Sequence, residues 1–231
     1  MNAIILAAGM GTRLKPLTND TPKSLVKVGY EPMIERQIRF LKEKGINDII
    51  IVTGYLHHKF EYLIEKFNVK LLYNDKYHLF NNIYSMYLVR NYLQDSYVIE
   101  ADVFMTNNFF KTDLKFSSYF AGIKHNVKKD WIIKFDNNDR IQDIIIDDGS
   151  EYIIAGISYW TKRDGLFIKE KLEEVIEKGK YKNLYWDNII QNHLESIDLK
   201  VTRINTSDWF EIDTMEDLES ANNYLLIKST D

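Results

Sequence analysis

The sequence contains no cysteine, and this absence removes several kinds of chemistry at once. Disulfide cross-links, thiolate zinc sites and cysteine nucleophiles are all excluded. A chain of 231 residues without disulfides has to be stabilised by a hydrophobic core, and its 45% hydrophobic residues are enough to build one. The lack of cysteine also suggests a reducing compartment, so we expect a cytoplasmic location.

Long apolar runs are missing as well. The first apolar stretch is only about six residues long and leads directly into glycines, so it predicts a buried strand rather than a signal peptide. No segment approaches the roughly 20 apolar residues that a membrane-spanning helix needs. We therefore expect no membrane span.

The chain also has no excess of positive charge. It carries 30 Lys and Arg against 34 Asp and Glu, which gives a formal net charge of −4. Binding along a nucleic-acid backbone requires a broad surplus of basic side chains, so no nucleic-acid partner is expected. Proline and glycine are sparse, at three and ten residues, and form no linker-like cluster. Residues 1–231 should therefore form a single domain.

In the first half, apolar stretches of strand length alternate with segments of helical period. This alternation is typical of βαβ units and predicts an α/β fold with a doubly wound, mainly parallel but mixed sheet. The expected strands are residues 3–8, 48–54, 69–74 and 96–102, and the expected helices are 33–45, 57–67 and 83–93.

After about residue 115 the pattern changes. Residues 131–147 read as a β-hairpin, because "DNNDR" supplies turn residues between two apolar stretches. Further strands are expected at 117–124, 152–160, 199–204 and 209–213, and helices at 162–179, 184–194 and from Thr214 onward.

A glycine turn follows the first strand, in "LAAGMGTR". Glycines let backbone N–H groups approach an anion, and ligands of such sheets bind beyond the carboxyl ends of the strands. The turn lacks the ending of a Walker loop, and Leu14 stands where a dinucleotide-binding loop has its third glycine. Taken alone, it also fits a tight turn made for packing. Arg13 and Lys23 favour phosphate binding, because a guanidinium fork and an ammonium can neutralise different parts of a triphosphate.

Residues 6–35, "LAAGMGTRLKPLTNDTPKSLVKVGYEPMIE", resemble the opening signature of the sugar-phosphate nucleotidyltransferases. The resemblance implies a Rossmann-like nucleotidyltransferase fold, and it makes Lys23 and Arg13 the catalytic residues. "NNIYS" at 81–85 stands where that family recognises the base. The residues expected to bind the nucleotide are Leu6, Ala8, Gly9, Gly11, Thr12, Arg13, Lys23, Tyr55, Asn82 and Ser85.

Two acidic motifs are candidates for a metal site, "EAD" at 100–102 and "EID" at 211–213. Nucleotidyl transfer brings two polyanions together, and carboxylate oxygens suit the Mg²⁺ that would offset their charge. Thr214 and Asp217 also form a capping-box pattern, so the late acids have an alternative explanation as a helix cap. The resemblance implies that Asp102 and Asp213 hold Mg²⁺.

Aromatic residues stand beside acids in the second half, at Trp131, in "LYWDN" and in "WFEID". Any one of them could simply be a core residue. A quaternary ammonium group has no N–H to donate, so it is recognised by ring faces and by unpaired negative charge, at about 0.5 to 2 kcal/mol per ring.

The order of these motifs closely resembles the small bacterial CTP:phosphocholine cytidylyltransferases, a group within the same family. That likeness implies CTP and phosphocholine as substrates, with a nucleotide-binding part at about 1–115 and a small acceptor-binding subregion of hairpin and helices within about 116–231. The residues it assigns to choline are Trp131, Tyr185, Asp187 and Glu211.

Three other functions stay open at this point: transfer to phosphoethanolamine or 2-aminoethylphosphonate, transfer to a sugar 1-phosphate, and nucleotide binding without turnover. The oligomeric state is also left open.

Overall fold

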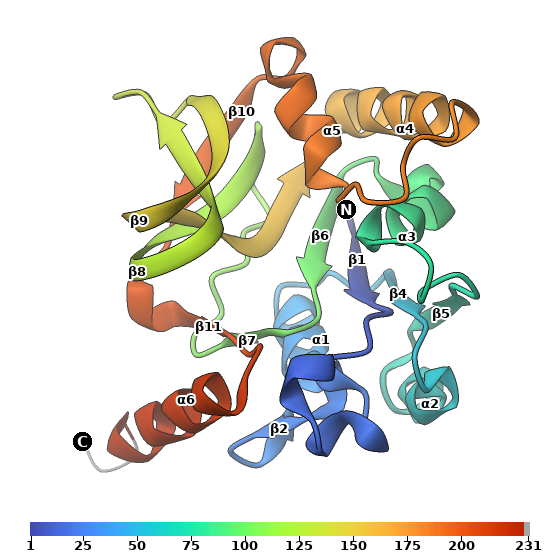
Figure 1. Cartoon of the computed structure of the whole chain (residues 1–231), viewed down its shortest axis with the longest axis vertical. Coiled ribbons are helices and arrows are strands. Elements are labelled where there is room, and N and C mark those ends of the chain that lie inside the picture. The colour runs from blue at the N-terminus through green and yellow to red at the C-terminus, as the bar shows by residue number, and fades with distance from the viewer. Residues whose placement is uncertain (229–231) are drawn as a thin grey trace.

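A seven-stranded sheet forms the centre of the molecule, in the computed structural model that describes residues 1–228 (Figure 1). The strand order is β10-β8-β9-β6-β1-β4-β5. These strands are β1 (Asn2–Ala7), β4 (Ile49–Thr53), β5 (Lys70–Tyr73), β6 (Ser96–Glu100), β8 (Ser117–Phe135), β9 (Ile141–Trp160) and β10 (Leu199–Arg203).

The sheet is mixed but mainly parallel, as the sequence predicts. β1 pairs in parallel with β4 and β6, β4 pairs in parallel with β5, and β10 pairs in parallel with β8. β9 is antiparallel to both of its neighbours, β6 and β8. The expected doubly wound α/β fold is therefore confirmed.

Both faces of the central strands β1 and β4 are buried. In β1, Ala3 and Ile5 belong to one hydrophobic cluster, whereas Ile4 and Leu6 belong to another. Successive strand residues point to opposite faces, so an unbroken apolar run is what a strand covered on both sides requires.

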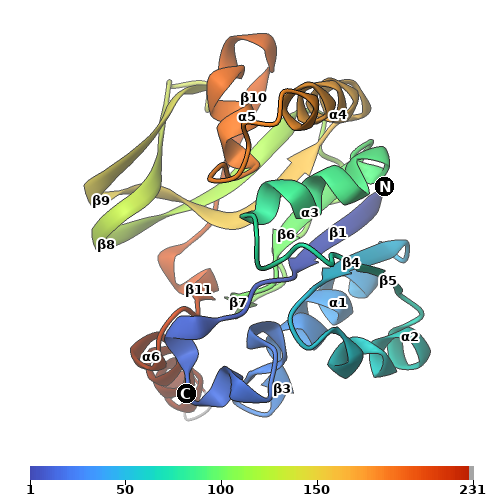
Figure 2. The same ribbon diagram turned by 45° about the vertical axis from the view of Figure 1, so that its right-hand side comes forward.

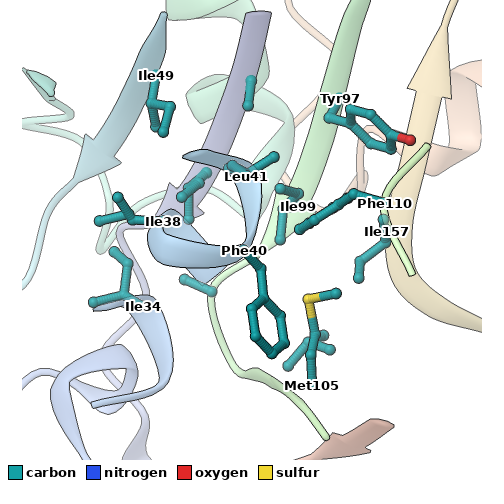
Figure 3. Close-up of a cluster of buried hydrophobic side chains, with 14 of the residues drawn as sticks. Ile34, Ile38, Phe40, Leu41, Ile49, Tyr97, Ile99, Met105, Phe110 and Ile157 are labelled. Carbon is teal, nitrogen blue, oxygen red and sulfur yellow. The ribbon is translucent and has the colours of Figure 1, made fainter. Parts of the chain in front are cut away.

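Different helices cover the two faces. Side chains of α1 (Met33–Glu43) and α2 (Tyr62–Phe67) pack on one side, and those of α3 (Asn82–Val89), α4 (Lys162–Glu177) and α5 (Asp187–Asn192) on the other. Figure 2 shows α1 and α3 on opposite sides of the central strands. Figure 3 shows the α1 face, where Ile34, Ile38 and Leu41 lie against residues of the sheet.

The segment 57–67 is not one continuous helix. A 3₁₀ turn covers His57–Phe60 and α2 begins at Tyr62, while Phe60 and Leu63 both reach the core. The last helix, α6, spans Met215–Lys228. Among residues 1–228, none of the helices combines the length and apolar character needed to cross a bilayer.

The second half differs from the expected pattern in one respect. The separate strands and the hairpin expected between 117 and 160 are two long strands, β8 and β9, joined by a turn at 136–140. Several irregularities in their register break the strands' alternation of buried and exposed residues, which is why the sequence suggests shorter pieces.

Short strands outside the main sheet bring distant segments together. β2 (Lys27–Val28) pairs with β3 (Glu31–Pro32), and β11 (Trp209–Glu211) pairs with β7 (Val103–Met105). In the second pair Glu211 lies opposite Val103, and the Ile212 N–H donates to the Asp102 carbonyl at 3.0 Å. The chain near residue 212 is thereby fixed beside the end of β6.

Candidate active site

Lys23 lies between two carboxylates from distant parts of the chain. Its Nζ donates to Asp102 Oδ2 at 2.6 Å and to Asp213 Oδ1 at 2.5 Å. Asp102 follows β6, and Asp213 follows β11, so the β7–β11 pairing described above brings the two acids together. Arg13, from the loop after β1, lies 2.8 Å from Asp213 Oδ1.

The two carboxylates keep Lys23 charged. Burial alone would lower the pKa of Lys23, but the charges and hydrogen bonds of Asp102 and Asp213 outweigh it and raise that pKa above its ordinary value. The Lys23 ammonium is therefore a fixed positive charge between Asp102 and Asp213.

The cap of α6 does not use the Asp213 side chain. Thr214 Oγ1 accepts from the Asp217 N–H, and Asp217 Oδ2 accepts from the backbone N–H groups of Asp213 and Thr214. Thr214 and Asp217 thus form the capping box. The carboxylate of Asp213 is directed instead to Lys23 and Arg13.

Asp102, Glu211 and Asp213 offer carboxylate oxygens that lie within 4.8 Å of one another. Part of the Glu211 side chain is exposed to solvent, but the protein atoms around its carboxyl group shield that group from water. That desolvation, together with the charges of Asp102, Asp213 and Asp130, raises the pKa of Glu211 to about 8. Hard oxygen donors at this spacing suit a divalent cation, and the Lys23 ammonium already contacts two of the three as a cation does.

A cavity of about 300 Å³ opens at the carboxyl ends of β1, β5 and β6. Of the residues expected to bind the nucleotide, those that line it are Leu6, Ala8, Gly9, Lys23, Asn82 and Ser85. The polar atoms of the last two already have protein partners. Asn82 contacts Glu100 and Trp186, and Ser85 Oγ accepts from Asn74 at 2.9 Å.

Gly11, Thr12, Arg13 and Tyr55 lie outside the lining of that cavity. Arg13 lines a second cavity, described next. Tyr55 shapes the loop, because its hydroxyl donates to the carbonyls of Thr18 and Asn19, each at 3.0 Å. Gly11 has φ +58°, and a Cβ at this position would lie 2.8 Å from Lys23 Cβ. The glycine turn thus packs directly against the stem of Lys23.

The second cavity, of about 460 Å³, brings together the four residues expected to bind the acceptor. The Trp131 and Tyr185 rings meet edge to face, with centroids 6.3 Å apart. The Tyr119 hydroxyl donates to Asp187 Oδ1 at 2.7 Å. Burial raises the pKa of Asp187 to about 6, although the bond from Tyr119 partly opposes that rise. Asp187 and Glu211 both line the cavity beside the two rings.

The two cavities meet at a shared wall. Residues that line both are Lys23, Asn82, Glu100, Asp102 and Tyr185. A phosphate group in one cavity and a phosphate group in the other would therefore face each other across the Lys23 ammonium. Such an arrangement suits the joining of two phosphorylated molecules.

Several lining residues were missed by the sequence reasoning. Glu100 lines both cavities, and burial followed by the charges of Asp102 and Asp187 raises its pKa well above the ordinary value. Its place in the acidic motif at the end of a strand was the available signal. Asn74, Tyr77 and Phe80 follow β5, another strand end on the same rim, and Tyr119 is recognisable only through its contact with Asp187.

Comparison with known proteins identifies a family to which the chain belongs and several similar proteins. The family model described as nucleotidyl transferase matches residues 2–228. A choline-phosphate cytidylyltransferase from Streptococcus pneumoniae is 44% identical over 94% of this chain and 95% of its own length. One from Haemophilus influenzae is 40% identical over 94% of each. A 2-aminoethylphosphonate cytidylyltransferase from Lancefieldella rimae is 32% identical over 94% of this chain and 90% of its own length.

The structure of a CTP:phosphocholine cytidylyltransferase from Streptococcus pneumoniae superposes with a TM-score of 0.95. The match has 43% identity and covers 97% of this chain and 98% of that one.

Proposed function

The chain belongs to the nucleotidyl transferase family, and from this premise we propose that it transfers the cytidylyl group of CTP to phosphocholine. The products are CDP-choline and pyrophosphate. The observation that carries the proposal is the meeting of two cavities at Lys23 and Asp102, one beside the glycine turn and one beside Trp131 and Tyr185. The full-length similarity to two choline-phosphate cytidylyltransferases supports the same substrates.

The reaction needs positioning more than proton transfer. A phosphate oxygen of phosphocholine attacks the α-phosphorus of CTP, and the bond from that phosphorus to the bridging oxygen of the β-phosphate breaks. Pyrophosphate leaves with that electron pair. Because the attacking oxygen is already anionic near neutral pH, the chemical step requires no general base.

Lys23 and Arg13 supply the fixed positive charge in this proposal. The Lys23 ammonium lies in the wall shared by both cavities, where it would contact the attacking phosphate and the α-phosphate. Arg13, with backbone N–H groups of the Gly9–Thr12 turn, would hold the β- and γ-phosphates. The charge that develops between the two phosphates is thereby balanced before the bond breaks.

Nucleotidyl transferases typically use a divalent metal, and the oxygen donors of the cleft fit one. We assign Mg²⁺ to Asp102 and Asp213, with Glu211 next to them. When bound, the cation would draw negative charge from the phosphates of CTP.

The acceptor pocket supports a quaternary ammonium ligand. The Trp131 and Tyr185 rings lie edge to face beside Asp187 and Glu211. Asp187 supplies negative charge near neutral pH, and a cation bound in the pocket would favour the ionised form of Glu211. A primary ammonium group would instead need hydrogen-bond acceptors for each N–H. The relative that acts on 2-aminoethylphosphonate makes this the rival acceptor class to test.

The lack of cysteine supports a cytoplasmic location.

The test is an assay of pyrophosphate release with CTP, UTP and dTTP, each offered phosphocholine, phosphoethanolamine, 2-aminoethylphosphonate and glucose 1-phosphate. We expect the fastest release with CTP and phosphocholine, and CDP-choline as the product in mass spectrometry. Faster turnover of either primary ammonium acceptor would contradict the choline assignment. Turnover only with a sugar phosphate would indicate a sugar nucleotidyltransferase, and no release with any pair would leave a nucleotide-binding protein.

A further inference from the structure

The segment that carries two of the acceptor-pocket residues is a turn region between α4 and α5. Tyr185 and Trp186 precede α5, and Asp187 is its first residue. The Trp186 indole is anchored in the core, with 2% of its surface exposed, whereas Tyr185 is 46% exposed in the cleft. Core packing fixes the Trp186 side chain and Tyr119 bonds the Asp187 carboxylate, whereas the backbone that carries Tyr185 and Asp187 has to be fixed by other contacts.

Three consecutive residues at the edge of the nucleotide cavity supply such contacts. The Phe80 and Tyr181 rings pack with centroids 4.8 Å apart. Asn81 Nδ2 donates to the Asn183 carbonyl at 3.0 Å. The Trp186 N–H donates to Asn82 Oδ1 at 2.9 Å. The chain at 80–82 thus holds the chain at 181–186 along its length.

Asn82 stands at the centre of this arrangement. Its Nδ2 donates to Glu100 Oε1 at 2.9 Å, while its Oδ1 accepts from Trp186. One amide therefore joins the end of β6 to the segment that carries Tyr185 and Asp187. Only a side chain with both a donor and an acceptor can make this pair of bonds, so neither an aspartate nor a leucine can replace it.

We propose that Asn82 is a positioning residue for the acceptor, which holds Tyr185 and Asp187 in place through its bonds to Trp186 and Glu100. This inference rests on the proposed function, since it concerns the pocket assigned to choline. It also gives Asn82 a task other than reading the base, because one N–H and one acceptor site of its amide are used by Glu100 and Trp186.

The test compares Asn82→Asp and Asn82→Leu with wild type. Asn82→Asp keeps the acceptor for Trp186 but loses the N–H donor that bonds Glu100, and Asn82→Leu loses both bonds. We expect each to raise the KM for phosphocholine about tenfold, because the segment that carries Tyr185 and Asp187 loses part of its hydrogen-bonded support. The KM for CTP should rise by a smaller factor than the KM for phosphocholine, since Lys23, Arg13 and the glycine turn, which hold the phosphates in the proposed function, are unchanged. The preference for phosphocholine over phosphoethanolamine should fall.

Asn81→Ala is a milder variant that removes only the bond to Asn183, and it should raise the phosphocholine KM in the same direction by a smaller factor. The matched control is Asn222→Asp on α6. Asn222 also accepts from a backbone N–H, that of Gly29 at 2.7 Å, and donates to a carbonyl, that of Leu218 at 2.9 Å, but it lines neither cavity. The KM values of the Asn222→Asp variant for phosphocholine and CTP should equal those of the wild type. Thermal unfolding of every variant separates positioning from loss of fold.

A higher KM for CTP with weaker discrimination against UTP, at unchanged phosphocholine KM, would show that Asn82 reads the base and would overturn the inference. Equal losses for both substrates that follow the loss of thermal stability would overturn it too, since they indicate packing alone. Wild-type protein that forms no CDP-choline would refute the proposed function itself, and the inference with it.

Discussion

The carboxylates of the cleft differ in their partners, and these partners separate their roles. Asp213 contacts the cationic groups of Lys23 and Arg13. Asp187 instead receives a hydrogen bond from the neutral hydroxyl of Tyr119, and its buried position raises its pKa to about 6. A carboxylate whose charge is not neutralised by the protein is suited to an incoming cation. Asp187 therefore fits the ammonium end of the acceptor, and Asp213 fits the phosphate end.

The raised pKa of Asp187 predicts that acceptor binding depends on pH. As the pH falls through about 6, Asp187 gains a proton and loses the charge that attracts the ammonium group. We expect the dissociation constant for phosphocholine, measured by calorimetry, to rise about tenfold per pH unit below this point. The stability of the folded protein depends on pH in the opposite direction. Because the carboxyl pKa is higher in the folded state than in the unfolded state, Asp187 favours folding at low pH, and this contribution is lost as the pH rises from about 4 to 6.

The phosphate of the ligand titrates near pH 6 as well, so Asp187→Asn is the required control. This variant should bind phosphocholine more weakly at pH 8 and keep only the pH dependence that belongs to the phosphate. Identical pH profiles for the variant and the wild type would show that Asp187 does not titrate in this range.

At the scale of elements, the glycine turn combines two different glycines. A Cβ on Gly9 would meet nothing within 4 Å, whereas one on Gly11 would lie 2.8 Å from Lys23 Cβ and 3.2 Å from Thr18 Cγ2. Gly11 also has a left-handed backbone, with φ +58°. The turn needs a glycine at position 11, because its backbone there is left-handed and because a side chain would displace Lys23.

Gly11→Ala should therefore lower the free energy of unfolding by about 1–2 kcal/mol, the cost of a left-handed alanine, and it should also reduce kcat because Lys23 is displaced. Gly9→Ala is the matched control, and its free energy of unfolding should change by less than about 0.5 kcal/mol. Urea denaturation and steady-state kinetics measure both effects. Equal stability of the two variants would contradict the role given to Gly11.

The sequence predicts those elements whose pattern is local. The strand Asn2–Ala7 follows from its apolar run, because Ala3–Ala7 are buried without interruption. The helix Met33–Glu43 follows from its helical spacing, because it buries one face while Arg36, Arg39 and Lys42 are not buried. The strand expected at 209–213 is confirmed as β11, but the pairings β2–β3 and β7–β11 were not predicted, because the partners of such short strands cannot be identified from the local pattern.

At the scale of the whole molecule, the site is assembled from three distant regions. Lys23 lies 79 positions from Asp102 and 190 from Asp213. Motifs indicated the kinds of residue involved, but not that the ammonium of Lys23 would bridge both acids. The contacts of Asn82 with Glu100 and Trp186 could not be predicted from the sequence either, because they depend on how the start of α3, the end of β6 and the segment before α5 meet in space.

Because this assembly brings carboxyl oxygens of Asp102, Glu211 and Asp213 within 4.8 Å of one another, turnover should require a divalent cation. Dialysis against EDTA should abolish CDP-choline formation, and Mg²⁺ should restore it. Asp213→Asn should lower kcat by about two orders of magnitude, the scale of losing one main electrostatic contact in the transition state.

Asp217→Ala provides the control for that loss, since Asp217 lies in the first turn of α6 and its carboxylate accepts from the backbone N–H groups of Asp213 and Thr214, without contacting the Asp213 carboxylate. It should cost about 1 kcal/mol of stability, as removal of a cap does, and leave turnover within about threefold. The two variants thus separate the charge of the cleft from the stability of α6. Full turnover of the wild type in EDTA, or an Asp213→Asn variant no slower than Asp217→Ala, would refute the metal assignment and leave Lys23 and Arg13 to balance the phosphates alone.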